Sequence, residues 1–236
     1  MNTTDEAIEK IVILGGGTAG WLAAATIGNI FKNTSMNIEV IESDDIGIVG
    51  VGEATIPPLI TILESLGIDL VDFIKETQAS FKLGIKFEDW GTVGESYFHP
   101  FGTLGQSIDG FDFYQCWLKC KAENDNTPLM AHSPESVLAE QGKFFLPHKA
   151  KNTPLSRAFY ALHLDSSLAG KYLRKFSENI GVKRTEGLVE QVNLHANGDI
   201  ANLVLKNGQQ IGADFFIDCS GFHGLLIEKT LKAGYE

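Results

Sequence analysis

Three closely spaced glycines follow the apolar run IVIL at residues 11–14, in the stretch GGGTAGWLAAA. Their spacing is G-x-G-x-x-G. In this pattern the first glycine makes a tight turn, the second lets the backbone approach a pyrophosphate, and the third packs a helix closely against the strand. A phosphate would lie at the start of that helix, where free N–H groups and the helix dipole favour negative charge. The predicted phosphate-binding residues are Gly15, Gly17, Thr18, Ala19 and Gly20.

An acidic residue lies at the position from which it could hydrogen-bond a ribose. The strand-like run MNIEVIES follows the predicted helix and contains Glu42. Glu42 lies about 20 positions after Gly20, the spacing at which an acid hydrogen-bonds ribose hydroxyls in dinucleotide-binding folds. Strand, turn, helix and acid together favour a bound dinucleotide over a glycine-rich turn that binds nothing.

Composition and charge narrow the class of protein. The chain has 236 residues, of which 44% are hydrophobic and 21% charged, as in ordinary globular proteins. A net charge of −11 argues against nucleic acid or an anionic membrane as a partner. The N-terminal MNTTDEAIEK lacks the apolar segment of a signal peptide, and no apolar run approaches the roughly 20 residues that span a bilayer. A cytoplasmic location is therefore expected.

The cysteines and histidines do not indicate a metal site. An odd number of cysteines, three, does not suggest a disulfide framework. Cys116 and Cys120 are four residues apart with no further His or Cys nearby, so we expect them to be buried core thiols on one helix face. The histidines form no H-E-x-x-H pattern. The segment DSSLAGKY ends like a phosphate loop, but Asp165 stands where the first glycine of that motif belongs.

After the first β-α-β unit, the sequence predicts some elements clearly and others poorly. A glycine-rich loop is predicted for residues 47–58, and the apolar-periodic segments LITILESLGI and DLVDFIKETQ predict two short helices. Residues 81–154 are rich in aromatic side chains and loops, and we expect an inserted segment there rather than an independent domain.

The last third of the chain has a clearer pattern. LDSSLAGKYLRKFSENIG predicts a helix with Asp165 or Ser166 as its N-cap and Gly181 as its stop. Three strand-like runs follow, GLVEQVNLH, IANLVLK and QQIGADFFIDCSG, joined by ANGD and NG turns that are typical of hairpins. A β-meander would then lead into a final apolar strand that ends in an acid. This order is typical of FAD-dependent hydroxylase folds, whereas a simple NAD domain continues with alternating helices and strands.

Several segments in one order resemble the flavin-dependent tryptophan halogenases. They are GGGTAGW, GVGEATIP, SFKLGIKFEDW, YFHPFG and DCSGFHGLLIE, from about residue 11 to residue 228. The resemblance implies an α/β fold over residues 1–236. It would be an FAD-binding Rossmann-like domain of the aromatic-hydroxylase and halogenase type, with a β-meander and an inserted substrate-side segment at about 81–154. Family members are considerably longer and carry W-x-W-x-I-P, a catalytic glutamate and a halide site further on. Trp21, Trp90 and Trp117 lie in no such pattern, so an N-terminal half of a longer chain is expected.

The resemblance also implies a reaction. Reduced FAD (FADH2), O2 and chloride or bromide would give hypohalous acid, and a lysine would direct it to an aromatic, tryptophan-like substrate. Lys82 in SFKLGIKF matches that lysine. An ammonium can donate to hypohalous acid, and a desolvated, neutral amine can form a chloramine. Lys86 lies four residues on, would face the same side of a strand and is a rival. Because the sequence has one dinucleotide fingerprint, we expect a separate flavin reductase to supply the electrons.

The resemblance assigns further site residues. His99 and Phe101 match a substrate-flanking pair in YFHPFG, where aromatic faces would stack on an indole or phenol, although an aromatic core loop is the alternative. Asp218 would lie near the ribityl chain of the flavin or serve only the fold. The remaining predicted cofactor contacts are Gly52, Glu53, Ala54, Thr55 and Val189.

Two other functions stay open at this point. The first is an FAD monooxygenase that hydroxylates an aromatic compound, against which Lys82 and the segment GEATIP weigh. The second is a flavin-binding fragment without catalytic activity, which the absence of the later motifs would favour.

Overall fold

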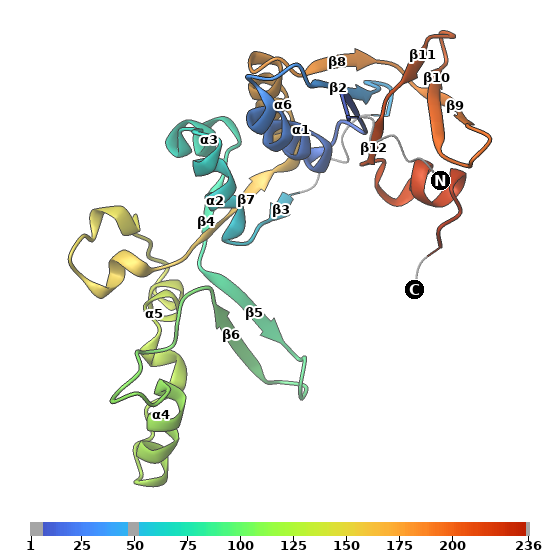
Figure 1. The fold of residues 1–236 in the computed structure, drawn as a ribbon. Coiled ribbons are helices and arrows are strands. Elements are labelled where there is room, and N and C mark those ends of the chain that lie inside the picture. The colour runs from blue at the N-terminus through green and yellow to red at the C-terminus, as the bar shows by residue number, and fades with distance from the viewer. Residues whose placement is uncertain (1–6, 47–51, 235–236) are drawn as a thin grey trace. The chain divides into compact units, whose positions relative to one another are not determined.

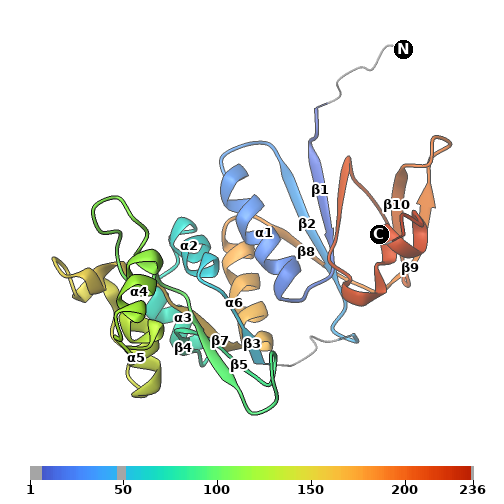
Figure 2. The same cartoon turned by 90° about the horizontal axis from the view of Figure 1, so that it is seen from below.

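The computed structural model describes residues 7–46 and 52–234, and the chain divides into two compact units. Unit 1 consists of Met1–Gly52, Leu66–Gln78 and Asp165–Glu236, and unit 2 of Glu53–Ser65 and Ala79–Leu164. The chain therefore passes between the units four times. Figures 1 and 2 show the elements of each unit in two views.

Unit 1 is built on a parallel sheet of four strands in the order β12-β1-β2-β8. These strands are β1 (Lys10–Leu14), β2 (Asn37–Glu42), β8 (Lys183–Glu186) and β12 (Phe215–Asp218). The helices of the unit are α1 (Thr18–Phe31), α3 (Leu70–Glu76) and α6 (Ser166–Asn179). Helices α1 and α6 lie side by side in both ribbon views, and they contact one another. Strand, turn, helix and second strand thus form the predicted β-α-β unit.

The predicted helix after residue 164 is confirmed as α6. Asp165 is its N-cap, and the Asp165 carboxylate accepts a hydrogen bond of 2.9 Å from the backbone N–H of Leu168. Just past the other end, Gly181 has φ +99°, a left-handed conformation that glycine adopts without steric cost. The cap and the stop therefore both lie where the sequence predicts them.

The predicted meander is also confirmed. It is an antiparallel sheet in the order β11-β10-β9, made of β9 (Val189–Leu194), β10 (Ile200–Leu205) and β11 (Gln210–Gly212). Its apolar side chains pack on those of β1 and β2 in one buried cluster, which includes Val12, Leu14, Ile41, Leu203, Leu205 and Ile211. Strand β12 then returns to pair with β1, and a 3₁₀ turn (Gly221–His223) and a π-helical turn (Leu225–Thr230) follow it.

Strand β8 is an element that the sequence analysis missed. Its residues are KRTE, and it pairs in parallel with β2 at the edge of the sheet. A charged run of four residues shows neither alternation nor an apolar core, so its pattern does not indicate a strand. The strand forms through its pairing with β2, whose backbone groups on that edge of the sheet are available for hydrogen bonds.

Unit 2 has two small sheets. A three-stranded sheet has the order β3-β7-β4, from β3 (Gly52–Ala54), β7 (Ala161–Asp165) and β4 (Ser80–Lys82), and a separate hairpin joins β5 (Gly84–Glu88) to β6 (Ser96–Pro100). The helices are α2 (Pro58–Ser65), α4 (Phe113–Ala122) and α5 (Pro134–Glu140), with 3₁₀ turns at Leu129–His132, Pro147–Lys149 and Pro154–Arg157. Helix α2, together with α3 of unit 1, corresponds to the two short helices predicted from LITILESLGI and DLVDFIKETQ.

Two expectations for these segments need revision. The predicted glycine-rich loop is a short strand, β3, at its described end, because Thr55 bonds to Leu162 of β7; residues 47–51 of that loop lie outside the described residues. Cys116 and Cys120 do share a helix, α4, but Cys116 is half-buried and Cys120 is exposed. Every residue of α4 retains some exposure, so the expectation of buried core thiols is wrong.

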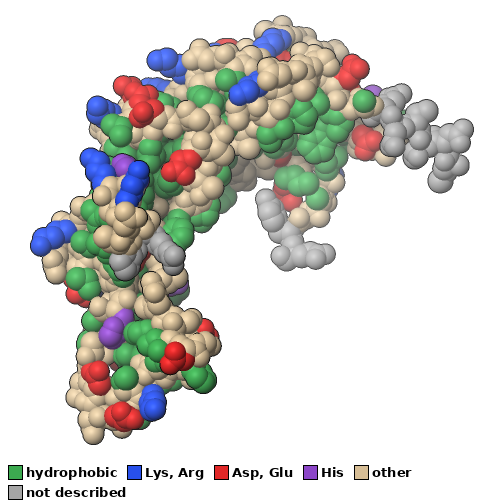
Figure 3. Space-filling model, turned by 60° about the vertical axis from the view of Figure 1, so that its left-hand side comes forward, with side chains coloured by type: hydrophobic (Ala, Val, Ile, Leu, Met, Phe, Trp, Pro, Cys, Tyr) green, Lys and Arg blue, Asp and Glu red, His purple; other side chains and the backbone are tan. Residues whose placement is uncertain are grey.

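Charged groups are spread over the surface in Figure 3, where Lys and Arg side chains lie among acidic and apolar ones on the face shown. Within residues 7–46 and 52–234, no helix combines the length and apolar character needed to cross a membrane.

Candidate functional site

The three glycines of the fingerprint meet three different surroundings. Gly15 has φ +113°, and a Cβ there would lie 2.2 Å from the carbonyl oxygen of Cys219. A Cβ on Gly20 would lie 1.9 Å from the carbonyl oxygen of Gly15. A Cβ on Gly17, by contrast, would meet no atom of the described residues within 4 Å. The residues Gly15 to Gly20, called the phosphate turn below, therefore combine a tight turn, an open approach and close helix packing.

The start of α1 is suited to an anion. Gly17 is the N-cap, no described side chain caps the helix, and its first turn has no acidic residue. The first N–H groups of a helix have no partner inside the helix, and they carry the positive end of its dipole. The hydroxyl of Thr18 donates to the carbonyl of Ser166 at 3.3 Å, so its backbone N–H is what it can offer a phosphate. This end of the phosphate turn fits a pyrophosphate.

Glu42, the predicted ribose acceptor, is held by side chains that the sequence analysis did not single out. Its Oε1 accepts from the guanidinium groups of Arg184 and Arg174, and its Oε2 accepts from the indole N–H of Trp21 at 3.2 Å. Its carboxylate lies against Gly16, where a Cβ would be 1.5 Å from Oε2. The middle glycine of GGG thus has its own role, which is to leave room for Glu42.

Arg184 links the carboxyl ends of β2 and β8. It pairs with Glu42 and, at 2.7 Å, with Asp44, and it also contacts Glu186. Burial acts to lower the pKa of Arg184, but the hydrogen bond and charge of Glu42 and the charge of Asp44 outweigh burial and raise that pKa. The cluster lies at the carboxyl end of the parallel strands, the edge at which ligands bind in open α/β sheets.

In unit 2, the predicted catalytic lysine is brought next to a predicted substrate residue. Lys82 is only 8% exposed, and its ammonium donates to the carbonyl of Thr55 at 2.9 Å. The same Nζ lies 5.2 Å from the ring centroid of Phe101, within the range of a cation–π contact. Burial lowers the pKa of Lys82 from its usual value. Lys82, Thr55 and Phe101 are called the lysine site below.

Thr55 owes its position to β7. Its hydroxyl donates to the carbonyl of Leu162 at 2.8 Å and accepts from the N–H of Leu162 at 3.0 Å. Its own N–H donates to the same carbonyl at 2.9 Å. These three bonds fix the residue, so its carbonyl oxygen is available to the ammonium of Lys82.

Lys86 does not share a strand with Lys82, and the expectation that both face one side of a strand is wrong. Lys82 ends β4, whereas Lys86 lies in β5 of the separate hairpin, because the chain leaves the first sheet at Leu83. The side chain of Lys86 is 59% exposed and pairs with Glu88. The two lysines therefore have opposite environments.

The other predicted site residues lie on several different elements. His99 lies on β6 and is exposed, whereas Phe101, just past the strand, is half-buried. Gly52, Glu53 and Ala54 are exposed on β3, and Val189 begins β9 against the buried cluster of unit 1.

Asp218 ends β12 and serves the backbone that follows. Its carboxylate accepts from the N–H groups of Ser220, Leu226 and Ile227 at 2.7–3.0 Å, and so holds the start of the π-helical turn. Burial acts to raise the pKa of Asp218, but these hydrogen bonds lower it.

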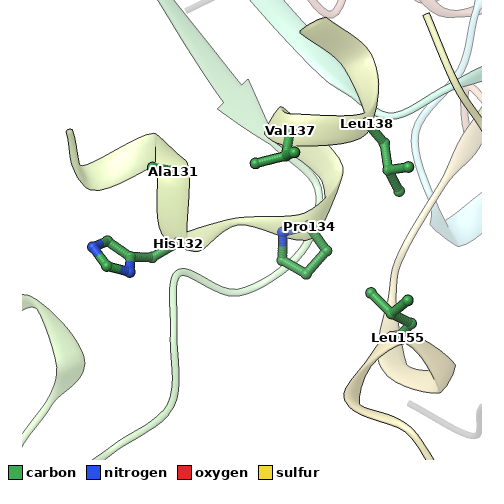
Figure 4. Close-up of a pocket in the computed structure, with 6 residues that line it drawn as sticks. All are labelled: Ala131, His132, Pro134, Val137, Leu138 and Leu155. Carbon is green, nitrogen blue, oxygen red and sulfur yellow. The ribbon is translucent and has the colours of Figure 1, made fainter. Parts of the chain in front are cut away.

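Unit 2 also has an open apolar hollow of about 370 Å³, lined by Ala131, His132, Pro134, Val137, Leu138 and Leu155. Figure 4 shows Pro134, Leu138 and Leu155 around a common space. None of the predicted site residues lines it. In the described part of the chain, no three His, Cys, Asp or Glu side chains gather as metal ligands would.

Comparisons with known proteins show which family and which solved structures this chain is similar to. The sequence model of the tryptophan halogenase family matches residues 10–236. RebH of Lentzea aerocolonigenes, a tryptophan 7-halogenase, is 34% identical over 95% of this chain and 44% of its own length. Among solved structures, the flavin-dependent halogenase Xcc4156 from Xanthomonas campestris has a TM-score of 0.89 and 43% identity, covering 98% of this chain and 46% of that one. BrvH, a flavin-dependent halogenase from Brevundimonas sp. BAL3, has a TM-score of 0.88 and 40% identity, with the same coverage.

Two facts follow from these likenesses. The TM-scores confirm the predicted fold class, a Rossmann-like α/β domain with a meander. The chain spans less than half the length of the relatives it matches.

Proposed function

The chain belongs to the tryptophan halogenase family, and on that premise we propose that it binds FAD and halogenates an aromatic, tryptophan-like substrate. The observation that carries the proposal is the buried ammonium of Lys82 between the carbonyl of Thr55 and the ring of Phe101. Bound FAD, once reduced, supplies the chemistry that uses O2 to oxidise chloride or bromide to hypohalous acid. The remaining steps are assigned to residues of this chain.

The residues of unit 1 would hold the pyrophosphate, the ribose and the adenine of the cofactor. The phosphate turn would bind the pyrophosphate through backbone N–H groups at the start of α1. Glu42 would accept from one ribose hydroxyl, because a carboxylate has about four lone-pair sites and its three present donors leave capacity for one more. Val189 would meet the adenine, and Gly52, Glu53, Ala54 and Thr55 would border the flavin ring.

Lys82 would act as its ammonium. Burial favours the neutral amine, but an acceptor at 2.9 Å and an aromatic ring at 5.2 Å both favour the cation. The ammonium would donate a proton to the oxygen of hypohalous acid while the aromatic carbon bonds to the halogen and the O–halogen bond breaks. Water leaves, and the aromatic carbon then gives its proton to the resulting amine, which restores the ammonium.

The substrate would be flanked by Phe101 and His99. A half-buried phenyl ring next to the ammonium would place an indole or phenol within reach of Lys82. A separate flavin reductase would supply the reduced cofactor, and the reaction would take place in the cytoplasm.

The test compares Lys82→Ala with Lys86→Ala. Each protein is given reduced FAD, O2, bromide and tryptophan or indole, with flavin oxidation followed by absorbance and products by mass spectrometry. Loss of a positioned proton donor costs about 10²–10⁴-fold in rate, so Lys82→Ala should lose halogenated product by that factor and still oxidise reduced FAD. The side chain of Lys86 is exposed, so Lys86→Ala should halogenate at the parental rate.

Other outcomes would contradict parts of the proposal. Halogenation by Lys82→Ala at the parental rate would remove Lys82 from its role. Hydroxylated product without halogenated product would identify a monooxygenase. Bound FAD with no product of either kind would identify a flavin-binding protein without this activity.

A further inference from the structure

Unit 2 contains a buried carboxylate that the proposed reaction does not use. Glu135 is 2% exposed and lies in the first turn of α5. Burying a carboxylate is costly unless hydrogen bonds replace its water, and an apolar side chain would fill the same space without that cost. A buried Glu therefore indicates that its oxygens have specific partners.

Three segments of unit 2 meet at this carboxylate. The hydroxyl of Ser133, the N-cap of α5, donates to Oε2 at 3.2 Å, and the backbone N–H of Phe159 donates to Oε1 at 3.1 Å. The same carboxyl group packs directly on the backbone of Gly102, where a Cβ would lie 1.9 Å from Oε1. Gly102 thus leaves the space that Glu135 occupies.

Two of these segments lead to the lysine site. Gly102 directly follows Phe101, whose own N–H donates to the carbonyl of Leu83 at 3.0 Å, next to Lys82. Phe159 is two residues before β7, and β7 contains Leu162, which fixes Thr55. The ring and the carbonyl that surround the ammonium of Lys82 are therefore each connected to Glu135 by a short stretch of backbone.

We propose that Glu135 is a positioning residue of the lysine site. It sets Phe101 through Gly102, and the Thr55 carbonyl through β7, around the ammonium of Lys82. The geometric part of this inference stands on the contacts of Glu135 alone, and its consequence for halogenation rests on the proposed function.

The test observes Lys82 without requiring activity. Protein labelled with ¹³C at the lysine ε-carbon gives one NMR signal for each lysine, and Lys82→Arg identifies the signal of Lys82. A ring near this methylene shifts its signal, and Phe101→Leu shows where the signal lies when the ring is lost. We expect Glu135→Ala to move the Lys82 signal towards the Phe101→Leu position. Glu135→Gln should keep most of the shift, because its amide oxygen can still accept from Phe159.

Glu140 provides the matched control. It is the last residue of the same helix and is exposed, so Glu140→Ala should leave the Lys82 signal where it is in the parent. A folded Glu135→Ala protein with the parental Lys82 signal would overturn the proposal. So would an equal displacement in Glu140→Ala, since it would show a general effect of changing α5.

A second variant keeps the test decisive where Glu135→Ala does not fold. Gly102→Ala pushes a methyl group into the carboxylate, so its Lys82 signal should also move, and a folded Gly102→Ala protein with the parental signal would overturn the proposal. Where both single variants fold, the double variant should show less than the sum of their losses in thermal stability, because removing the carboxylate makes room for the methyl group. Additive losses would contradict the contact.

Activity then separates this inference from the proposed function. In a halogenating protein, Glu135→Ala should lower kcat about tenfold and raise the KM of the aromatic substrate, while Glu140→Ala leaves both unchanged. A parent that halogenates nothing would refute the proposed function and leave the NMR result to decide the role of Glu135.

Discussion

The phosphate turn of unit 1 and the lysine site of unit 2 are built by different means. The phosphate turn is a contiguous stretch whose roles are set by backbone geometry, with Gly15 and Gly20 enclosed and Gly17 open. The lysine site is assembled from three separate strands or strand ends, and side chains set its geometry. Backbone geometry can be anticipated from residue spacing, whereas a site made by side-chain contacts depends on which segments the fold brings together.

The difference also predicts how each region fails. In the phosphate turn, added side-chain volume should matter most, and its effect should depend on which glycine receives it. In the lysine site, loss of a single hydroxyl or carboxylate should matter, because each holds one of the groups around Lys82.

The largest expected effect is on cofactor binding. Gly17→Val should weaken FAD binding at least about 1000-fold, or about 4 kcal/mol, because it fills the space through which a phosphate would approach. Its melting temperature should stay close to that of the parent, since no described atom lies within 4 Å of the added Cβ. Titration of each protein with FAD, followed by flavin fluorescence, measures the affinity. Gly91→Val is the control, because Gly91 lies in the turn between β5 and β6, where an added Cβ would make only an ordinary contact of 3.9 Å with the carboxylate of Glu95. Equal affinities for all three proteins would exclude the phosphate turn as the cofactor site.

Gly15→Ala should instead damage the fold of unit 1. The residue has φ +113°, and its Cβ would overlap the carbonyl of Cys219, so we expect a loss of about 3 kcal/mol in the free energy of unfolding. Calorimetry should show the loss as a lower melting temperature without bound cofactor. Gly17→Ala is the matched variant and should melt with the parent. Equal melting of Gly15→Ala and the parent would mean that the turn is looser than its contacts indicate.

Unit 1 should also be the acid-sensitive part of the molecule, because of Glu39 on β2. Burial acts to raise the pKa of Glu39, but hydrogen bonds from Lys10, Thr185 and Lys183 lower it from 4.5 to about 2. A lowered pKa stabilises the fold fully above pH 4.5, and this stabilisation is lost as the pH falls towards 2. A difference of this size amounts to about 3 kcal/mol.

Urea unfolding between pH 6 and pH 2 measures that loss. Glu39→Gln removes the titrating group, so its stability should change less with pH over this window than that of the parent. The same pH dependence in both proteins would assign the acid sensitivity to other carboxylates.

The smallest expected effect concerns the lysine site. Thr55→Val keeps the shape of the side chain but removes both hydroxyl bonds to Leu162, so the carbonyl that faces Lys82 is held less firmly. The rate of halogenation should fall about tenfold, equivalent to about 1.4 kcal/mol in the barrier. Thr55→Ser keeps the hydroxyl and should stay within about twofold of the parent. A slower Thr55→Ser than Thr55→Val would show that the hydroxyl is not what matters.

Much of unit 1 is predictable from the sequence for a physical reason. The run at residues 11–14, the glycine spacing, the Asp165 cap and the two hairpin turns are local patterns that act within a few residues. Each agrees with the fold around it, so local preference and tertiary structure give the same result.

The predictions that failed concern residues whose placement depends on distant parts of the chain. Arg184 contacts Glu42 across about 140 positions of sequence, and no local pattern connects the two. Lys82 and Lys86 are spaced as neighbours on one strand face, but the chain changes sheets between them. In each case a contact between distant segments decides the outcome, and residue spacing carries no information about it. Gly16 is the exception, because the middle glycine of GGG, which G-x-G-x-x-G does not require, is a visible signal of close approach.

Because Gly15 contacts Cys219, the phosphate turn can close only late in the synthesis of the protein. The carbonyl that encloses the first glycine of the phosphate turn belongs to a residue about 200 positions later, next to the strand that pairs with β1. At about 5–20 residues per second, a ribosome takes roughly 10–40 s to add that many residues. During this interval the buried face of β1 and the start of α1 have no β12 beside them, whereas the contacts of unit 2 can already form from residues 53–65 and 79–164. The nascent chain can thus form the lysine site while the parallel sheet of unit 1 still lacks β12.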